Sequence, residues 1–492
     1  MITRRGFLAT APAALAAAAR VPPPKPYGAI PSSRQLRWHT LESTAFLHFT
    51  VNTFTNREWG LGDEDPNLFN PAKLDADAIV APLAGAGMRG VILTCKHHDG
   101  FCLWPTQTTG HSVRATSWKG GQGDVVREIS DAARRHGLLF GVYVSPWDRN
   151  HPAYGKPEYI PVYRQQLTEL LTGYGPIFEV WHDGANGGDG YYGGAREKRT
   201  IDKATYYDWP RTWDLVRILQ PDAVIFSDVG PDVRWVGNER GIAGDPCWAT
   251  YNPVGSDGGP ASPGDVRQRE SPTGTRHGAQ WLPAECDASI RPGWFWHENE
   301  NARVKTPAQL IDLHYKSVGR GATLLLNVPP NRDGLLSAED IASLGILGDY
   351  RRATFAHNLL AKAKASSSQV RGHHRAYAPA NLLDGREDTC WATDDGATAA
   401  EAVFDLPRPA TFNVIRIRED IRFGQRIDAV AVDVRQSGTW EQVASATSIG
   451  PRRLIRLAKP ILAQRLRLRV TEASASPVLS ELAVFAEPDI AH

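Results

Sequence analysis

The chain has 492 residues, too many for one ordinary domain, and 42% of them are hydrophobic, which is typical of a globular protein. Its net charge is +1 and it has no basic run, so neither nucleic acid nor an anionic membrane surface is expected as a partner. The five cysteines are scattered, without a Cys-x-x-Cys pair, and indicate neither a disulfide framework nor a zinc site. The 15 tryptophans are unusual: most are expected in the core, but their flat apolar faces also suit sugar rings.

The N-terminus has the features of an export signal. Arg4 and Arg5 precede an apolar, alanine-rich run, and residues 17–19 supply small side chains for cleavage. The paired arginines indicate the twin-arginine route. We therefore expect residues 1–25 to be a signal peptide and the protein to be periplasmic or extracellular. The apolar run is too short to span a bilayer as a stable helix.

Strand-like and helix-like segments alternate between residues 26 and 360. Continuous apolar runs predict strands at residues 44–50, 90–95, 138–144, 177–181, 223–226 and 322–328. Apolar residues at helical spacing predict helices at residues 74–86, 124–135, 159–174, 206–219, 306–319 and 338–355. This alternation predicts a parallel α/β architecture, and apolar strands with polar tips favour a closed (β/α)8-like TIM barrel over an open sheet. A Gly-, Ser- and Pro-rich segment, 255–275, is expected to be a surface loop.

The pattern changes near residue 360. Helical periodicity fades, and short alternating runs appear at residues 400–405, 413–418, 429–434 and 465–470. Alternation with a period of two is typical of strands with one solvated face. Residues 361–492 are therefore expected to form a C-terminal all-β sandwich.

Polar residues follow several of the predicted barrel strands. Asp183 lies just beyond the strand 177–181, where a TIM barrel carries its catalytic groups, and we interpret it as the catalytic centre. His48, His97 and His98 also lie at strand tips. Their spacing matches no zinc motif, so hydrogen bonding to substrate hydroxyl groups is favoured over metal binding.

Asp183 needs a partner if the chemistry is glycoside hydrolysis, which uses two carboxyl groups that flank one bond. The candidates downstream are Asp228, Asp232 and Glu239. Spacing alone does not choose between them. Each also has a structural interpretation as a turn carboxylate or as an ion-pair partner of Arg234.

Four sequence blocks, taken together and in order, resemble the α-L-fucosidases of glycoside hydrolase family 29. They are HFTVNTFTNREWG at 48–60, KHHDGF at 96–101, VWHDGA at 180–185 and VRWVGNE at 233–239. The resemblance implies hydrolysis with retention through a covalent fucosyl-enzyme, with no cofactor and no metal in the catalytic site. By matching motifs, it implies that Asp183 is the nucleophile and Glu239 the general acid/base, and that the three histidines bind fucose hydroxyl groups.

The same resemblance extends to the lining of the site and to the substrate. The motif forms around Asp183 and Glu239 are similar to the subfamily that cleaves α-1,3 and α-1,4 fucosyl branches, so fucosylated glycans are the expected partners. Further residues are expected to line the site, with Trp294 or Trp296 beside the fucose methyl group: Glu58, Trp59, Trp181, Arg234, Trp294 and Trp296. Trp235 is expected to give Glu239 an apolar wall that holds its proton near neutrality.

The C-terminal segment PANLLDGREDTCW, residues 379–391, resembles the discoidin-like (factor 5/8 type C) sandwich. Such domains bind glycans in many proteins, and Asp384 and Asp388 would offer oxygen ligands to a structural calcium ion. A sandwich that only supports the barrel is the alternative. Two rival functions remain for the whole chain: a non-catalytic glycan-binding protein on a decayed barrel, and an exo-glycosidase that acts on another sugar.

Overall fold

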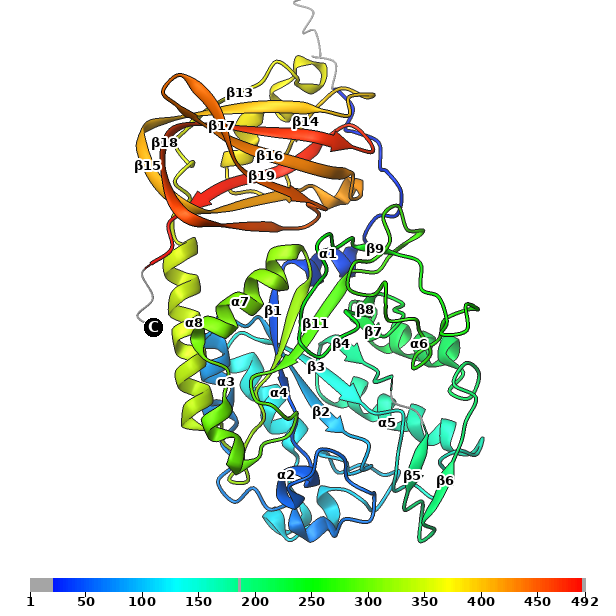
Figure 1. The fold of residues 1–492 in the computed structure, drawn as a ribbon. Helices are drawn as coiled ribbons and strands as arrows, with labels where there is room; N and C mark the ends of the chain where they lie inside the picture. The colour runs from blue at the N-terminus through cyan, green and yellow to red at the C-terminus, as the bar shows by residue number, and fades with distance from the viewer. Residues whose placement is uncertain (1–20, 185–186, 489–492) are drawn as a thin grey trace, which may run out of the picture.

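A computed structural model describes residues 21–184 and 187–488 (Figure 1). Most of the predicted leader, 1–25, lies outside the described residues. Its last five residues are described, and they contact the C-terminal domain: Arg426 donates to the carbonyl oxygen of Lys25 at 2.6 Å, and Tyr377 to that of Val21 at 3.3 Å. No helix among the described residues combines the length and apolar character needed to cross a membrane.

The first domain is a closed barrel of eight parallel strands, which confirms the predicted fold class. Around the barrel the order is β1-β12-β11-β8-β7-β4-β3-β2. The strands are β1 (Ser43–Leu47), β2 (Gly90–Lys96), β3 (Leu139–Val144), β4 (Ile177–Trp181), β7 (Val224–Ser227), β8 (Val233–Trp235), β11 (Ala284–Ser289) and β12 (Thr323–Asn327). Buried Val, Ile and Leu side chains dominate several of these strands, as expected for strands covered on both faces.

Helices cover the outside of the barrel (Figure 1). They are α3 (Ala76–Gly85), α4 (Val125–Arg135), α5 (Tyr159–Gly173), α6 (Trp209–Leu219), α7 (Pro307–Lys316) and α8 (Ala338–Phe355). Three start at caps that the sequence supplies. In α3, the side chain of Asp75 accepts a hydrogen bond from the Ala78 amide. The side chain of Asp124 accepts a hydrogen bond from the Arg127 amide, and Thr306 forms a capping box with Gln309.

The barrel departs from strict β/α alternation in one region. β7 and β8 are joined by residues 228–232 without a helix, and β8 and β11 by the long segment 236–283, which holds only the short strands β9 (Thr250–Tyr251) and β10 (Gln280–Trp281). The predicted loop 255–275 lies in this segment. Neither β8 nor β11 was predicted, because β8 is three residues long and Glu285 and Asp287 interrupt the apolar pattern of β11.

The second domain is antiparallel, as predicted for the C-terminal sandwich. Its strands are β13 (Lys364–Ser366), β14 (Trp391–Ala392), β15 (Ala400–Glu419), β16 (Ile427–Gln436), β17 (Thr439–Thr447), β18 (Arg453–Ala473) and β19 (Val478–Phe485). The two runs predicted as separate strands, 400–405 and 413–418, belong to the single strand β15. Shifts of register between Asp405 and Ala410 and between Phe412 and Val414 bend this strand near Pro407 and Pro409.

The two residues proposed to hold calcium bind neighbouring groups of the chain. Both oxygens of Asp388 accept hydrogen bonds from the Arg386 guanidinium, at 2.9 and 2.7 Å. Asp384 accepts from the Arg386 amide and from the Thr389 hydroxyl group. Residues 21–184 and 187–488 contain no group of three or more His, Cys, Asp or Glu that could hold a metal, so the calcium site stays a prediction.

The sandwich packs against the end of the barrel at which the strands begin (Figure 1). Glu42, immediately before β1, forms ion pairs with Arg418 at 3.3 Å and with Arg452 at 2.5 Å, both from the second domain. Asp245 pairs with Arg453 at 2.7 Å. The carboxyl ends of the strands, where the site was predicted, therefore lie at the opposite end of the barrel from the sandwich.

Candidate active site

A pocket of about 290 Å³ lies at the carboxyl ends of the barrel strands. Eight of the predicted site residues line it: His48, Trp59, His97, His98, Trp181, Asp183, Glu239 and Trp294. Eight further residues complete the lining, and the sequence suggested either a different role or no role for each of them: Phe46, Tyr143, Gly184, Asp228, Trp235, Gly264, Gln268 and Asp287. The pocket thus combines four carboxyl groups, three imidazoles and several aromatic rings.

Asp183 reaches the pocket because side chains alternate along β4 and its extension. Trp181 and Asp183 point inward, whereas His182 points outward and its Nδ1 lies 2.8 Å from the Tyr163 hydroxyl group. Gly184 then lets the chain pass close to Asp228. A Cβ atom at this glycine would lie 2.4 Å from Asp228 Oδ2, so any larger residue would displace one carboxyl group or the other.

The hydroxyl group of Tyr143 donates a hydrogen bond to Asp183 Oδ2 at 2.8 Å. His98 Nε2 lies 3.9 Å from the same oxygen. Burial raises the pKa of Tyr143 well above its ordinary value, and the adjacent carboxylate raises it further, so this donor keeps its proton. Sequence reasoning missed Tyr143 because it stands in an apolar strand; its place as the last inward residue before the end of β3 was the available signal.

His48 presents an acceptor nitrogen to the pocket. The side-chain amide of Asn327 donates to Ser289 Oγ and to the Trp294 carbonyl oxygen, which leaves Asn327 Oδ1 to accept from His48 Nδ1 at 2.9 Å. Burial lowers the pKa of His48 to about 3, so the ring is neutral and its Nε2 carries a lone pair. A substrate hydroxyl group can donate to it.

The same logic applies to His98. The Ser145 hydroxyl group donates to the Trp147 carbonyl oxygen and therefore accepts from His98 Nδ1 at 2.7 Å. Burial lowers the pKa of His98 to about 4, which leaves Nε2 as a second acceptor beside Asp183. The ring of His97 lies between those of His48 and His98, and its buried Nδ1 has no partner within the described chain.

Two further carboxyl groups have environments that retain a proton. Burial raises the pKa of Asp228 to about 6, and the charge of Asp183 adds to this effect. Burial raises the pKa of Asp287 well above its ordinary value even though the Trp235 indole donates to Asp287 Oδ1 at 2.6 Å. Asp232, in contrast, does not line the pocket. It accepts from Arg217 and from the Ile225 amide.

Glu239 lies exposed at the mouth of the pocket, in the loop that follows β8. Gly237 and Gly241 flank it with φ angles of 82° and 66°, a left-handed conformation that favours glycine. Arg240 forms a backbone bridge with Ala288, which fastens this loop to β11. In the part of the chain that the structure describes, Glu239 forms no ion pair with Arg240, so the structural interpretation of this carboxylate gains no support.

Aromatic rings form the floor and one wall of the pocket. Trp181 stacks on Tyr143 with ring centroids 5.2 Å apart and on Phe226 at 4.1 Å. Trp294 lies 5.0 Å from His48, and the exposed Trp59 meets His98 edge to face at 5.2 Å. These faces offer apolar contact to one sugar ring and a platform at the rim.

Three predicted lining residues lie outside the pocket lining. Glu58 binds the loop that carries Trp294, because it accepts from the Trp294 amide at 2.7 Å and from His297 at 2.6 Å. Trp296 donates to Ser337 Oγ. Arg234 is fully buried on the outward face of β8, where it donates to the carbonyl oxygens of Ser271, Trp248 and Leu282.

Comparisons with known proteins agree with this architecture. The Alpha-L-fucosidase family model matches residues 30–354, and the F5/8 type C domain model matches residues 362–482. Alpha-L-fucosidase 1 of Arabidopsis thaliana is 44% identical over 469 residues, which cover 94% of this chain and 89% of that protein. A glycoside hydrolase 29 family member from an unknown rumen bacterium is 42% identical, with a TM-score of 0.83 over 95% of this chain and 79% of that one. A GH29 fucosidase of Ruminococcus gnavus in complex with fucose is 33% identical, with a TM-score of 0.84 over 96% and 98% of the two chains.

Proposed function

The chain belongs to the α-L-fucosidase family, glycoside hydrolase family 29, and we propose that it is an exported, retaining, exo-acting enzyme that removes terminal α-1,3- or α-1,4-linked L-fucose from glycans. The observation that carries the proposal is the convergence of Asp183, Glu239 and the three histidines on one aromatic-floored pocket. Two carboxyl groups that line one pocket with hydroxyl-binding histidines support a two-carboxylate mechanism.

Asp183 is the proposed nucleophile. It accepts a hydrogen bond from Tyr143 and lies beside His98, whose ring is neutral. It attacks the anomeric carbon, and the covalent fucosyl-enzyme is later hydrolysed by water.

Glu239 is the proposed acid/base. Its place at the mouth is where the leaving part of the glycan must lie, so bound substrate would cover its carboxyl group and favour the protonated form. It would protonate the departing oxygen and then take a proton from the attacking water. Asp228 is the competing candidate, because it already holds a raised pKa of about 6 within the same pocket.

The neutral histidines support recognition of a sugar. The Nε2 atoms of His48 and His98 are acceptors for hydroxyl groups, and His97 lies between them. Phe46 and Trp294 provide an apolar wall of the kind that the methyl group of a 6-deoxy sugar needs. The exposed ring of Trp59 is the proposed platform for the next sugar, on which selectivity for branched linkages would depend.

The test compares release of fucose from a Lewis-type branched oligosaccharide and from an activated aryl α-L-fucoside. Asp183→Ala is expected to lose at least about 1,000-fold in kcat on both substrates. Glu239→Gln is expected to lose far more on the oligosaccharide, because an activated aryl group leaves without a proton. With azide, Asp183→Ala should give the inverted fucosyl azide and Glu239→Gln the retained one.

Asp228→Asn is the matched control for the acid. If Asp228→Asn shows the leaving-group dependence and Glu239→Gln does not, the acid role belongs to Asp228. Faster cleavage of galactose- or rhamnose-terminated glycans would contradict fucose specificity. Binding of the oligosaccharide without any release would favour the non-catalytic alternative, and cell fractionation before and after replacement of Arg4 and Arg5 by lysine tests export.

A further inference from the structure

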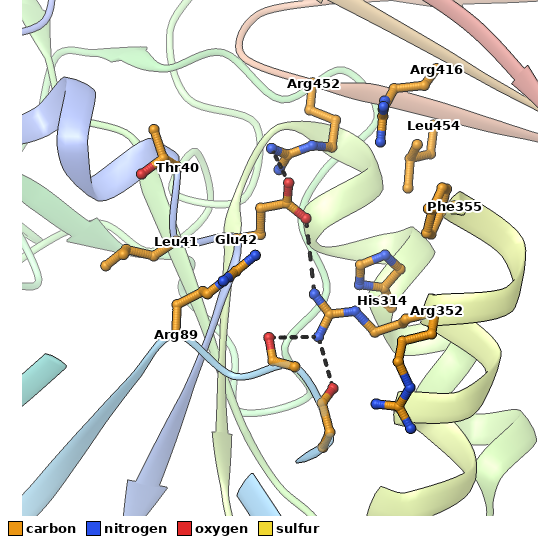
Figure 2. A pocket seen from close by; sticks show the side chains of 14 residues that line it. Thr40, Leu41, Glu42, Arg89, His314, Arg352, Phe355, Arg416, Arg452 and Leu454 are labelled. Atoms are coloured by element: carbon orange, nitrogen blue, oxygen red, sulfur yellow. Dashed lines mark hydrogen bonds and ion pairs between the residues drawn. The ribbon is translucent and has the colours of Figure 1, made fainter. Parts of the chain in front are cut away.

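A second, cationic pocket lies between the base of the barrel and the sandwich, at the far end from the active site (Figure 2). Its volume is about 250 Å³. Barrel segments before β1 and β2, helices α7 and α8, and the sandwich strands β15 and β18 all contribute to it. Its charged and titratable lining residues are Glu42, Arg89, His314, Arg351, Arg352, Arg416 and Arg452.

Part of this positive charge is neutralised outside the pocket. Arg416 forms a two-fold hydrogen bond with Glu481 at 2.8 and 2.7 Å, and Arg352 pairs with Asp349 at 2.5 Å. Arg418, which also contacts Glu42, has Glu481 at 3.0 Å and Glu387 as further partners. For the remaining arginines of the pocket, Arg89, Arg351 and Arg452, the carboxylate in the lining is that of Glu42.

Three arginines share the single charge of Glu42. Arg452 lies 2.5 Å and Arg351 3.9 Å from its carboxylate. A dashed line in Figure 2 marks the contact between Arg452 and Glu42. The exposed side chain of Arg89 faces the same space and forms no ion pair within the described chain. Arg89, Arg351 and Arg452 against Glu42 leave an excess of two positive charges.

Buried donors in this pocket also lack partners. Arg452 is only 4% exposed, and its Nε atom has no hydrogen-bond partner among the described residues. His314 is 2% exposed and its Nδ1 atom likewise has none. Burial lowers the pKa of Arg452 to about 9, which reflects the cost of a guanidinium that one shared carboxylate does not offset.

We propose that this pocket binds a tetrahedral dianion, a sulfate or phosphate group, and that the anion links Arg89 and Arg351 of the barrel to Arg452 of the sandwich. Two negative charges match the local excess, and oxygen acceptors suit guanidinium donors that meet from different directions. The anion is either a free inorganic ion or an ester group on a sugar. Binding at this end of the barrel is independent of fucose hydrolysis and of its residues.

Thermal unfolding at constant ionic strength tests the proposal. Millimolar phosphate or sulfate, balanced with chloride, should raise Tm by roughly 3 °C in the full-length protein. Isothermal titration with inorganic phosphate should give a one-site isotherm. Arg89→Ser removes an exposed charge without opening the core and should weaken binding at least about 10-fold. Arg408→Ser, which removes an exposed arginine outside the pocket, is the matched control and should bind normally.

Glucose 6-phosphate distinguishes the two sources of the anion. Binding of inorganic phosphate but not of the ester supports a free ion, and comparable binding of the ester supports a sugar-borne group. Fucose release should be the same in wild type and Arg89→Ser. A general salt effect would stabilise wild type, Arg89→Ser and Arg408→Ser equally. That outcome, or the absence of any difference from chloride, would overturn the proposal.

Discussion

Beneath the active site, the barrel encloses a pair of glutamates that makes its stability depend on pH. Glu179 on β4 and Glu285 on β11 are both fully buried. The indole of Trp38 donates to Glu179 Oε2 at 3.0 Å, and that of Trp181 donates to Glu285 Oε1 at 2.9 Å. The other oxygens of the pair, Glu179 Oε1 and Glu285 Oε2, have no hydrogen-bond partner among the described residues, and the charge of Glu179 raises the pKa of Glu285, so the pair retains a proton. Burial raises the pKa of both, that of Glu179 to about 8.

The size and sign of the effect follow from these values. Because the folded pKa lies above the ordinary value of 4.5, the folded chain holds this proton more tightly than the unfolded chain. Its contribution to stability is therefore full below pH 4.5 and is lost as the pH rises through about 8. Within this window the free energy of unfolding falls by about 1.4 kcal/mol per pH unit, or about 3 kcal/mol from pH 5.5 to 7.5.

Glu179→Gln removes this dependence. The glutamine amide is a neutral replacement for the protonated carboxyl group and its oxygen can still accept from Trp38, so the variant has no proton to lose at this position. Urea unfolding should be followed by tryptophan fluorescence at several pH values. Between pH 5.5 and 7.5 the free energy of unfolding of the variant should rise by about 3 kcal/mol relative to that of wild type. Glu298→Gln, at an exposed site, is the control and should run parallel to wild type. A constant difference between Glu179→Gln and wild type across this range would refute the reasoning.

Three further changes test individual contacts. Tyr143→Phe removes the hydrogen-bond donor to Asp183 and should lower kcat/KM for an α-L-fucoside by about 10- to 100-fold in steady-state assays. The Tm should not fall. Unchanged kinetics would show that this hydrogen bond does not contribute to the reaction. Lys96→Met removes the cation that lies 3.2 Å from the buried carboxylate of Asp148 and should lower the free energy of unfolding by about 3–5 kcal/mol in unfolding experiments. An unchanged free energy of unfolding would show that this ion pair does not stabilise the fold. Asp124→Ala removes the N-cap of α4 and should lower the free energy of unfolding by about 1 kcal/mol, measured in the same way. Asp124→Asn is the control: its side-chain oxygen can still cap the helix, so most of the stability should be kept.

The sequence predicted the barrel strands that are apolar and missed a strand that carries carboxyl groups. Strands such as β2 and β3 are apolar on both faces, and their pattern predicts them directly. β11 escaped prediction because Glu285 and Asp287 point into the barrel, where burial raises the pKa of the first and the second lines the pocket. In the sequence alone, a strand with inward-pointing carboxyl groups cannot be told from a polar loop.

Site residues that follow a strand could be predicted from the sequence, whereas those that lie within a strand could not. Asp183 and the three histidines stand beyond strand ends, so their position at the rim follows from the order of elements. Arg234 was expected at the site because its block, residues 233–239, resembles a block of the fucosidase family. Alternation along β8 places Arg234 and Trp235 on opposite faces, and without knowledge of that strand the direction of neither side chain could be assigned.

The placement of the sandwich bears on what that domain does for the enzyme. A glycan held by the sandwich would lie beyond the base of the barrel, whereas the pocket opens at the opposite end. The contacts that the sandwich does make are with the barrel itself: Arg418 and Arg452 meet Glu42 directly before β1, and Ser448 accepts from the amide of Cys247 in the long segment that follows β8. That segment begins with the loop of Glu239. The sandwich therefore supports both the first strand of the barrel and its least regular connection, and it does so from the side on which no substrate has to pass.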